Sequence, residues 1–307
     1  MRDLRANEAG KSDDARRDVR SLLRIARGQL RAADVPSADL ASELLLIHVL
    51  GRDRAWLYTY PDASLSADKA ALYTALVVKR CTGMPTQYLT GKQEFWGLEF
   101  EVTRDVLIPR PETEHLVEVS LERIGARREH SLTIADVGTG SGCVAVALAR
   151  EMSAADIYAT DISAAALEVA RRNAERHGIA DRVHFAVGNL LEPFFLDMTA
   201  GAKPELNLIV SNPPYIARRD METLPREVGR HEPPQALFGG EIGTEMYAPL
   251  FQQAKALLAV GGIIAVEIGF GAMVAIYELL DSDAAWRDVA VNNDLAGIPR
   301  VVSAVRN

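Results

Sequence analysis

The spacing of hydrophobic and polar positions changes character twice along this chain of 307 residues. Residues 1–17 are rich in charge and nearly free of large apolar side chains, which predicts a flexible tail. Residues 18–84 show helical spacing, with helices expected near 37–50 and 66–81. The first helix of this region presents one apolar face: Val19, Leu22, Leu23, Ala26 and Leu30. We therefore predict a small N-terminal helical domain.

Residues 85–110 follow a period of two instead. Alternation over residues 88–91 and 94–102, with a glycine turn, predicts a β-hairpin that joins two domains. The run from Ile108 to Glu114 then breaks the strand and opens a helix through Ile124. Pro111 suits an early position of that helix, because its missing N–H has no partner there in any case.

From residue 132 onward, short apolar runs alternate with stretches of helical spacing. The expected strands cover residues 133–137, 156–160, 183–187, 206–211 and 263–268, with a terminal pair at 289–293 and 300–305. The expected intervening helices cover residues 143–151, 164–177 and 247–258. This rhythm predicts an α/β fold, in which a mostly parallel sheet is covered on both faces and the terminal pair adds an antiparallel edge.

Composition narrows the class of protein. Hydrophobic residues make up 48% and charged residues 25%, as in soluble globular proteins. No apolar run approaches a membrane span and no hydrophobic signal core is visible, so we expect a cytoplasmic protein. The two cysteines, Cys81 and Cys143, are too few for a disulfide framework, and no spacing indicates a metal site. The net charge of −8 argues against broad binding to a phosphate backbone.

A glycine-rich turn follows the first expected strand of the sheet. It contains Gly138, Thr139, Gly140, Ser141 and Gly142, and such glycines let a ligand approach the main chain closely. Nineteen residues after Gly142, Asp161 ends the second strand, where an acid accepts hydrogen bonds from ribose hydroxyls. The glycine spacing lacks the longer gap of the dinucleotide fingerprint, so it favours a nucleoside without a pyrophosphate. Read alone, the glycine run is also compatible with a tight strand–helix turn.

Two further positions extend this expected nucleoside site. The third strand leads to Asn189 and Leu190, and a side chain at one of them is expected to lie at the edge of an adenine ring. Asn189 is also a common turn residue, so a purely structural role is the alternative.

The most informative motif is Asn212-Pro213-Pro214-Tyr215, directly after the strand at residues 206–211. Two consecutive prolines lack N–H donors and force the chain out of the sheet in an extended shape. Asn212 then stands at the carboxyl end of a strand, where open α/β sheets bind ligands. The side-chain oxygen of Asn212 and the carbonyl of Pro213 form adjacent acceptors that suit an –NH2 group, and Tyr215 is expected to pack against its bearer. The alternative interpretation is an ordinary turn after a strand.

Taken together, these residues resemble class I S-adenosylmethionine-dependent amino-methyltransferases. More specifically, the chain resembles the bacterial glutamine methyltransferases of class-1 peptide release factors (the HemK/PrmC family). The resemblance covers residues 18–306 and includes the stretches 88–91, 94–98, 107–114, 231–233, 236–237 and 239–240. It implies a Rossmann-like class I methyltransferase sheet at residues 111–307, a β-hairpin linker at 85–110, and a helical domain at 18–84 that this family uses to grip its substrate.

The resemblance also implies roles for individual residues. Asn212 and the carbonyl of Pro213 would accept both N–H bonds of the substrate glutamine amide, while Pro214 and Tyr215 would shape the slot for its methylene chain. The glycine-rich turn would pass the methionine part of S-adenosylmethionine, and Asp161 would hold its ribose. The expected product is S-adenosylhomocysteine, and the expected protein substrate is a class-1 release factor with its Gly-Gly-Gln motif. No general base is implied, because a methyl sulfonium is already a strong electrophile.

Two departures from the family pattern stand out. Residues 241–244 replace the usual Asp-Gly-Leu, and we expect this change to leave the methyl-transfer step untouched. Asn189 stands at a position where members of this family commonly have an acidic residue.

Three other functions remain as alternatives. A sister enzyme that methylates a ribosomal-protein glutamine would share most motifs, although residues 110–113 and 236–240 fit the release-factor branch better. A nucleic-acid adenine methyltransferase would use the same Asn-Pro-Pro-Tyr slot but would need to flip a base and bind phosphates. A non-catalytic adaptor would not bind S-adenosylmethionine.

Overall fold

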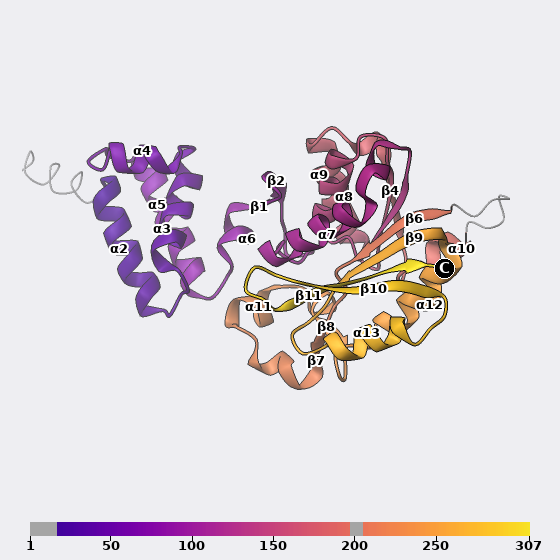
Figure 1. Cartoon of the computed structure of the whole chain (residues 1–307). Helices are drawn as coiled ribbons and strands as arrows, with labels where there is room; N and C mark the ends of the chain where they lie inside the picture. Colours follow the sequence, from indigo (N-terminus) through magenta and orange to yellow (C-terminus); the bar gives the residue numbers. More distant parts are fainter. Residues whose placement is uncertain (1–16, 197–204) are drawn as a thin grey trace, which may run out of the picture. The chain divides into compact units, whose positions relative to one another are not determined.

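The computed structural model describes residues 17–196 and 205–307 (Figure 1). The chain divides into two compact units. The helical unit comprises the chain up to Gly91 together with Arg226–His231, and the α/β unit comprises Lys92–Pro225 and Glu232–Asn307. Apart from Arg17, the predicted tail at residues 1–17 lies outside the described residues.

The helical unit contains the helices expected from the sequence, which are α2 (Val19–Ala32), α3 (Ala38–Leu50) and α5 (Ala67–Cys81). It also contains short helices that the sequence analysis did not predict: α4 (Arg54–Thr59), α6 (Thr86–Thr90) and α11 (Arg226–His231). Helix α2 begins where the Asp18 side chain accepts a hydrogen bond from the backbone N–H of Ser21, and α3 ends at Gly51 with a φ of 67°. The prediction of strand alternation at residues 88–91 was wrong. This segment lies in and just after α6, and Gly91 ends that turn of helix in the left-handed conformation.

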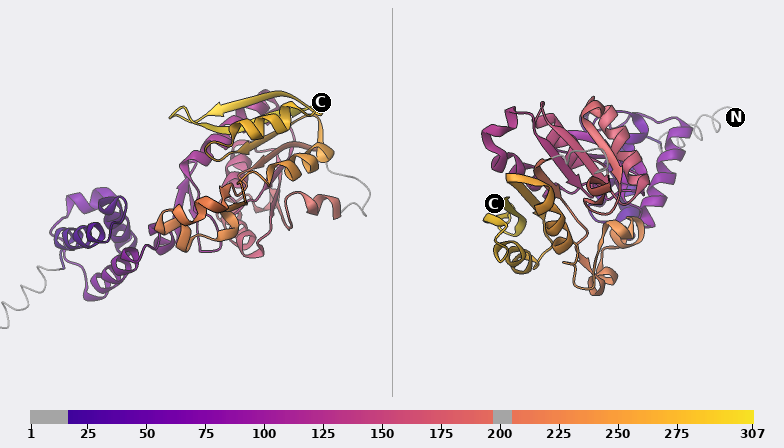
Figure 2. Two further views of the ribbon diagram at one scale, coloured as in Figure 1. Left: turned by 90° about the horizontal axis from the view of Figure 1, so that it is seen from below. Right: turned by 90° about the vertical axis from the view of Figure 1, so that its right-hand side faces the viewer.

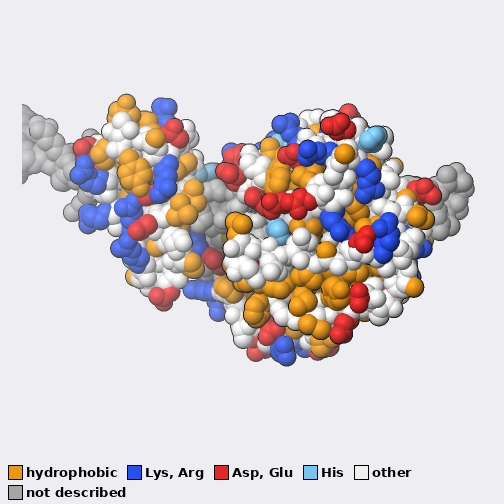
Figure 3. All heavy atoms as spheres, viewed as in Figure 1, with side chains coloured by type: hydrophobic (Ala, Val, Ile, Leu, Met, Phe, Trp, Pro, Cys, Tyr) orange, Lys and Arg blue, Asp and Glu red, His pale blue; other side chains and the backbone are white. Residues whose placement is uncertain are grey.

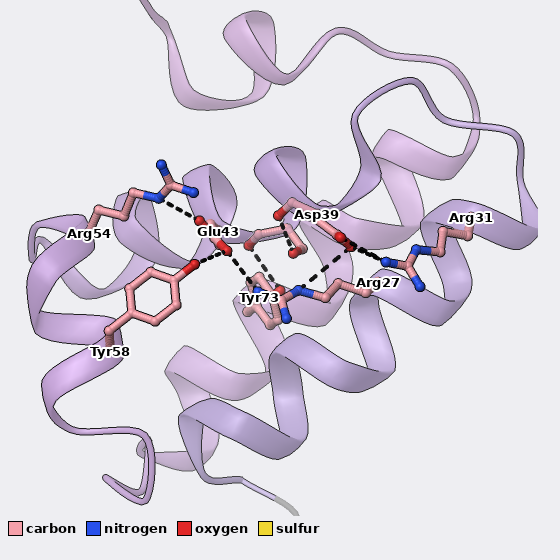
Figure 4. A network of polar contacts seen from close by, with 8 residues as sticks. Arg27, Arg31, Asp39, Glu43, Arg54, Tyr58 and Tyr73 are labelled. Carbon is pink, nitrogen blue, oxygen red and sulfur yellow. Dashed lines mark hydrogen bonds and ion pairs between the residues drawn. The ribbon is translucent and has the colours of Figure 1, made fainter.

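A buried carboxylate stabilises the packing of α2, α3 and α4 (Figure 4). The side chain of Glu43 is 3% exposed and accepts hydrogen bonds from Arg27, Arg54 and Tyr58, each at 2.7 Å. Burial raises the pKa of this carboxyl, but these donors and the two positive charges outweigh burial and lower the pKa of Glu43 below its usual value. The charge is therefore retained in the interior because it is fully paired.

The α/β unit begins with the predicted hairpin, β1 (Lys92–Phe95) and β2 (Leu98–Glu101). Its turn consists of Trp96 and Gly97, with φ of 54° and 67°, as in the tight turns that match strand twist. The chain then forms a short 3-10 helix, Pro111–Thr113, and α7 (Glu114–Ile124), as expected from Pro111.

A seven-stranded sheet follows, with the order β10-β11-β9-β6-β3-β4-β5. Its strands are β3 (Thr133–Val137), β4 (Asp156–Asp161), β5 (Val183–Val187), β6 (Leu206–Ser211), β9 (Leu258–Glu267), β10 (Trp286–Asn293) and β11 (Pro299–Arg306). All pairs are parallel except those of β11 with β9 and with β10. The terminal strands, yellow in Figure 2, therefore close one edge of the sheet with the expected antiparallel pair.

Helices cover both faces of this sheet (Figures 1 and 2). Helices α7, α8 (Cys143–Glu151) and α9 (Ala164–Arg176) pack on the face that includes Ile134. Helices α10 (Glu192–Leu196), α12 (Tyr247–Leu257) and α13 (Met273–Asp281) pack on the face of Ala135 and Val137. Alternate residues of β3 thus enter two separate cores, which confirms the predicted α/β class. Among the described residues, no helix combines the length and apolarity that a bilayer crossing requires.

Candidate active site

The glycine-rich turn connects β3 to α8. Gly138, Gly140 and Gly142 have φ of 74°, 56° and 79°, conformations that glycine adopts without strain. A Cβ at Gly142 would lie 3.0 Å from the Cβ of Ala170, so this glycine allows α8 and α9 to approach closely. Glycine is therefore favoured at all three positions by the positive φ, and at Gly142 also by the close packing of the two helices.

Asp136, at the end of β3, holds the turn from inside. Its Oδ2 accepts hydrogen bonds from the Thr139 hydroxyl at 2.6 Å and from the backbone N–H of Ala145 at 3.1 Å. Complete burial raises the pKa of Asp136 to about 6, although both donors oppose the shift. This carboxylate was not among the predicted site residues, and its position just before Gly138 was the available signal.

Asp161, at the end of β4, lies next to the turn. Its Oδ2 accepts the backbone N–H of Gly140 and its Oδ1 accepts that of Ser163, both at 2.9 Å. Burial raises the pKa of Asp161, and these backbone donors oppose the shift. Each oxygen keeps a further lone pair for a ligand hydroxyl, and the carboxylate is rigidly oriented.

Asn189 and Leu190 follow β5 as expected. Leu190 has a φ of 53°, and its carbonyl accepts the Thr160 hydroxyl at 2.9 Å, so the chain turns sharply here. The Asn189 amide donates to Oε1 of Glu192 at 3.1 Å. Asn189 therefore both stabilises this turn and lines the cavity described below.

The Asn-Pro-Pro-Tyr segment leaves the sheet at the end of β6. The hydroxyl of Ser211 donates to the carbonyl of Val137 at 2.8 Å, which ties the ends of β6 and β3 together. The side-chain nitrogen of Asn212 donates to Oγ1 of Thr113 at 3.0 Å. This bond turns the –NH2 side of Asn212 toward Thr113, so its side-chain oxygen is the atom left for a ligand.

Three glycines surround the backbone and ring of Tyr215. A Cβ at Gly239, within β8 (Phe238–Gly240), would lie 2.5 Å from the carbonyl oxygen of Pro214. A Cβ at Gly243 would lie 2.5 Å from the carbonyl oxygen of Tyr215, and one at Gly269 would lie 2.9 Å from its ring. Residues 241–244, which depart from the family pattern, therefore lie against the segment expected to hold the substrate. The strand β7 (Ile216–Ala217) pairs with β8 and continues this close packing.

A cavity of about 330 Å³ brings most of the predicted site residues together. They are Gly138, Gly140, Asp161, Asn189, Leu190, Asn212, Pro213 and Pro214. Thr139 and Ser141 line a smaller cavity of about 50 Å³, which shares Gly138, Gly140 and Asn212 with the larger one. Gly142 and Tyr215 line neither, because Gly142 faces Ala170 and Tyr215 packs against Gly269.

Other parts of the chain complete the wall of the larger cavity. They are Asp105, Val106, Leu107, Ile162, Ser163, Ala166, Pro233, Gln235, Ala236, Phe238 and Met246. Of these, Leu107 lies in the stretch 107–114, and Pro233 and Ala236 lie in the stretches 231–233 and 236–237. The sequence analysis did not single out the others.

The segment at residues 105–110 is held by a buried carboxylate. Glu232 is 3% exposed, its Oε2 accepts the backbone N–H of Ile108 at 3.2 Å, and its Oε1 is paired with the guanidinium of Arg110. Arg110 in turn lines the smaller cavity. Phe95, which belongs to the stretch 94–98 of the family resemblance, is buried against Phe100 in the core and lines neither cavity.

The described residues contain no cluster of three or more potential metal ligands. The donors around the cavity are carboxylate, amide, hydroxyl and backbone groups, which suit a polar organic ligand with hydroxyl and amino groups. The Asp161 carboxylate at the end of β4 and the Asn212 amide oxygen just after β6 are two oriented polar groups that line the same cavity.

Comparisons with known proteins give matches over most of the chain. Residues 9–91 match the family model described as PrmC N-terminal domain, and residues 116–227 match that described as Methyltransferase small domain. The chain is 43% identical to a release factor glutamine methyltransferase of Koribacter versatilis over 275 residues, which cover 89% of this chain and 93% of the relative. It is 40% identical to a release factor glutamine methyltransferase of Geobacter sulfurreducens, covering 92% and 95%.

A solved structure supports the fold alone. The crystal structure of the hMettl16 catalytic domain matches with a TM-score of 0.54 at 15% identity and covers 82% of this chain and 92% of that one. At this identity the likeness extends to the arrangement of strands and helices.

Proposed function

We propose that this chain, which belongs to the release factor glutamine methyltransferase family, methylates the side-chain amide nitrogen of the glutamine in the Gly-Gly-Gln motif of class-1 release factors. The observation that carries the proposal is the orientation of Asn212. Its –NH2 group is bound by Thr113, and its oxygen remains as an acceptor beside the cavity that Gly138, Gly140 and Asp161 also line.

The cavity fits S-adenosylmethionine as the methyl donor. The Asp161 carboxylate is oriented by two backbone N–H groups and keeps lone pairs for the two ribose hydroxyls. Asn189 and Leu190 line the same cavity and would border the adenine, while the glycine turn would border the methionine part. When bound, S-adenosylmethionine supplies a methyl group on a positively charged sulfur, with a neutral leaving group. Its demethylated product is S-adenosylhomocysteine.

Within this chemistry, the protein positions a poor nucleophile. An amide nitrogen is weakly nucleophilic because its lone pair is delocalised into the carbonyl. The Asn212 oxygen and the Pro213 carbonyl would accept its two N–H bonds and so fix the direction of the lone pair. Orientation of this kind supplies about 7–11 kcal/mol in favourable cases. The same two acceptors stabilise positive charge that develops on the nitrogen. The N-methylated amide is acidic and would lose its extra proton to water or to one of these acceptors, so no strong general base is required.

The test is methylation of purified protein. The chain is incubated with S-adenosylmethionine and a class-1 release factor, and peptides are mapped by mass spectrometry. We expect one added methyl group on the glutamine of the Gly-Gly-Gln peptide. An unmodified release factor, with normal binding of S-adenosylmethionine by calorimetry, would contradict the proposal and direct the assay to a ribosomal-protein glutamine.

A nucleic-acid substrate is less well supported. The chain carries a net charge of −8, and on the face seen in Figure 3 acidic and basic side chains are interspersed over the α/β unit. A protein that binds phosphates through many contacts would show binding that falls steeply with salt. Filter binding of single-stranded oligonucleotides at several salt concentrations would reveal such behaviour.

A further inference from the structure

Two strongly exposed apolar residues of the α/β unit belong to segments that pack against Tyr215. Ile242 is 72% exposed and Phe270 is 88% exposed. Ile242 is followed by Gly243, where an added Cβ would lie 2.5 Å from the carbonyl oxygen of Tyr215. Phe270 is preceded by Gly269, where an added Cβ would lie 2.9 Å from the Tyr215 ring. Single apolar residues scattered over a surface are ordinary, but these two flank the same tyrosine of the proposed substrate slot.

The loop that carries Ile242 is held in place by Glu245. One carboxylate oxygen of Glu245 accepts the backbone N–H of Ile242 and the other accepts that of Thr244, each at 2.9 Å. This loop joins Phe238 to Met246, and both of these residues line the larger cavity. The exposed side chain of Ile242 therefore stands on a fixed main chain, midway between two segments of the cavity wall.

The turn that carries Phe270 connects β9 to α13. The backbone N–H of Ala272 donates to the carbonyl of Gly269 at 3.1 Å and so closes a four-residue turn. Gly271 has a φ of 81°, which suits the third position of a type II turn. Because β9 runs parallel to β6, this turn leaves the sheet at the same edge as Asn212.

The loop and the turn are also joined in the interior. Tyr247, at the start of α12, is fully buried, and its hydroxyl donates to the carbonyl of Glu267 at 2.9 Å. Glu267 is the last residue of β9, just before the turn of Phe270. Tyr215 and Tyr247 thus connect the two segments, and we refer to Ile242 and Phe270 together as the apolar rim.

A protein substrate has to cross the edge of the slot. The slot takes a glutamine side chain, so the main chain on either side of that glutamine must continue over the surrounding surface. The two glycines of a Gly-Gly-Gln segment have no side chains and offer little apolar area for binding. Affinity for the whole protein must then come from enzyme surface outside the slot. Exposed aromatic and apolar side chains are the kind that specific protein interfaces bury at their centre.

We propose that the apolar rim, Ile242 and Phe270, docks the release factor by packing on apolar side chains next to its Gly-Gly-Gln segment. This inference rests on the proposed function, because it extends the same substrate site from the glutamine to the protein that carries it. Continuity with that site supports this occupant. Both rim residues adjoin glycines packed on Tyr215, and the Ile242 loop begins and ends at residues of the cavity wall.

The rim also gives a role to the departure from the family pattern at residues 241–244. When Gly243 is matched to the glycine of the usual Asp-Gly-Leu, Ile242 stands in the place of the acid. An exposed acid favours a basic or polar partner group, whereas an exposed isoleucine favours an apolar one. The change therefore concerns which protein surface is bound and leaves the methyl-transfer step untouched.

The central experiment compares Phe270→Ser and Ile242→Ser with Val260→Ser in the full chain. Val260 is 83% exposed near the start of β9, away from the strand end that carries the rim. We measure kcat and KM for the release factor, its Kd in the presence of S-adenosylhomocysteine, and the Kd of S-adenosylmethionine. Each rim variant should raise KM and Kd for the release factor at least about 5-fold, as truncation of an anchoring side chain does. Val260→Ser should match the wild type.

A separation of KM from kcat distinguishes docking from other roles. Neither rim residue lines a cavity, so kcat and the Kd of S-adenosylmethionine should stay within about 2-fold of the wild type. Denaturant midpoints should be unchanged, because both side chains are exposed. The conservative variants Phe270→Leu and Ile242→Val keep the apolar surface and should retain most of the affinity. Ile242→Asp should weaken binding as Ile242→Ser does.

Several results would overturn the inference. One is a KM within about 2-fold of the wild type for Phe270→Ser or for Ile242→Ser. Another is a fall in kcat with KM unchanged, which would place the rim in the chemical step. A third is self-association of the wild type in sedimentation that Phe270→Ser abolishes while KM for the release factor stays the same, because the rim would then join two copies of this chain. Failure of the proposed function looks different, since the wild-type chain itself would leave the release factor unmethylated.

Discussion

Gly239→Ala is the perturbation whose effect can be worked out most directly from the structure. Gly239 lies in β8, against the main chain of the Asn-Pro-Pro-Tyr segment. An added Cβ would be 2.5 Å from the carbonyl oxygen of Pro214 and 2.6 Å from the Cα of Tyr215. The φ of Gly239 lies outside the left-handed region, so alanine adds no backbone strain there. The steric overlap of the added Cβ is then the whole effect of the substitution. The atoms it meets are main-chain atoms, which cannot rotate away as a side chain does.

The size of the effect follows from the distance. Ordinary contact with a Cβ begins at 3.4 Å, so the Pro214 carbonyl must move by about 3.4 − 2.5 = 0.9 Å. Misplacement of a reacting group by about 1 Å can cost about 100-fold in rate, which corresponds to about 2.7 kcal/mol of barrier. We therefore expect kcat for release-factor methylation to fall about 100-fold. The Kd of S-adenosylmethionine should change little, because neither Asp161 nor the glycine turn is displaced.

The assay is release-factor methylation followed by mass spectrometry, together with calorimetry for the cofactor. Gly28→Ala is the matched control. Gly28 lies in α2 with no atom within 4 Å of an added Cβ, so this change should leave kcat unaltered and stabilise the helix by up to about 1 kcal/mol. If Gly239→Ala kept a kcat within about 3-fold of the wild type, the close packing around Tyr215 would not control the position of the substrate amide.

Four further predictions test other parts of the molecule. Asn212→Ala should lower kcat about 100-fold and leave cofactor affinity unchanged, because it removes one of two acceptors for the substrate amide; full activity in the methylation assay would rule out the amide clamp. Asp161→Ala should raise the Kd of S-adenosylmethionine at least about 10-fold by calorimetry, and an unchanged Kd would place the ribose elsewhere. Glu43→Ala should lower the free energy of unfolding by about 1–3 kcal/mol, less than for a fully buried ion pair because the Arg27 and Arg54 side chains are 31% and 61% exposed. Because the pKa of Glu43 is lowered, the stability that its charge contributes is present above the ordinary pKa of 4.5 and is lost as the pH falls below it. Equal denaturant midpoints of variant and wild type at pH 7 would refute this prediction. Burial raises the pKa of Glu267 from 4.5 to about 7, so the folding stability that its protonated form contributes is complete below pH 4.5 and is lost as the pH rises through 7. The free energy of unfolding of Glu267→Gln should therefore exceed that of the wild type by up to about 3 kcal/mol at pH 8 and by little at pH 5. A difference that does not change with pH in urea titrations would contradict this.

Much of the fold was predictable because strands and helices follow local patterns of apolar and polar residues that recur along the chain. Apolar runs about six residues long between helical stretches predicted the strands, and β3, β5 and β6 have the predicted bounds. β9 begins five residues before the expected start at Ile263, because Gly261 and Gly262 interrupt the apolar run without ending the strand. The error at residues 88–91 has a similar origin, since alternation over four residues does not distinguish a strand from one turn of helix.

The candidate site was only partly accessible from the sequence. Motif spacing singled out Gly138, Gly140, Asp161 and Asn212, and the structure brings these residues to one cavity; their binding roles remain predictions. Tyr215 was expected beside the substrate, yet its ring packs against Gly269 and it lines neither cavity.

By itself the sequence determined the α/β class, the order of elements and the family, because hydrophobic periodicity and short motifs are local properties of the chain. The tertiary structure decided which distant groups meet. Thr113 and Asn212 come from segments 99 residues apart, and no spacing relates them. Thr113 lies directly before α7 and Asn212 directly after β6, and their hydrogen bond forms only when the chain folds. The direction in which the Asn212 amide points depends on that contact, and so it could be obtained only from the folded chain.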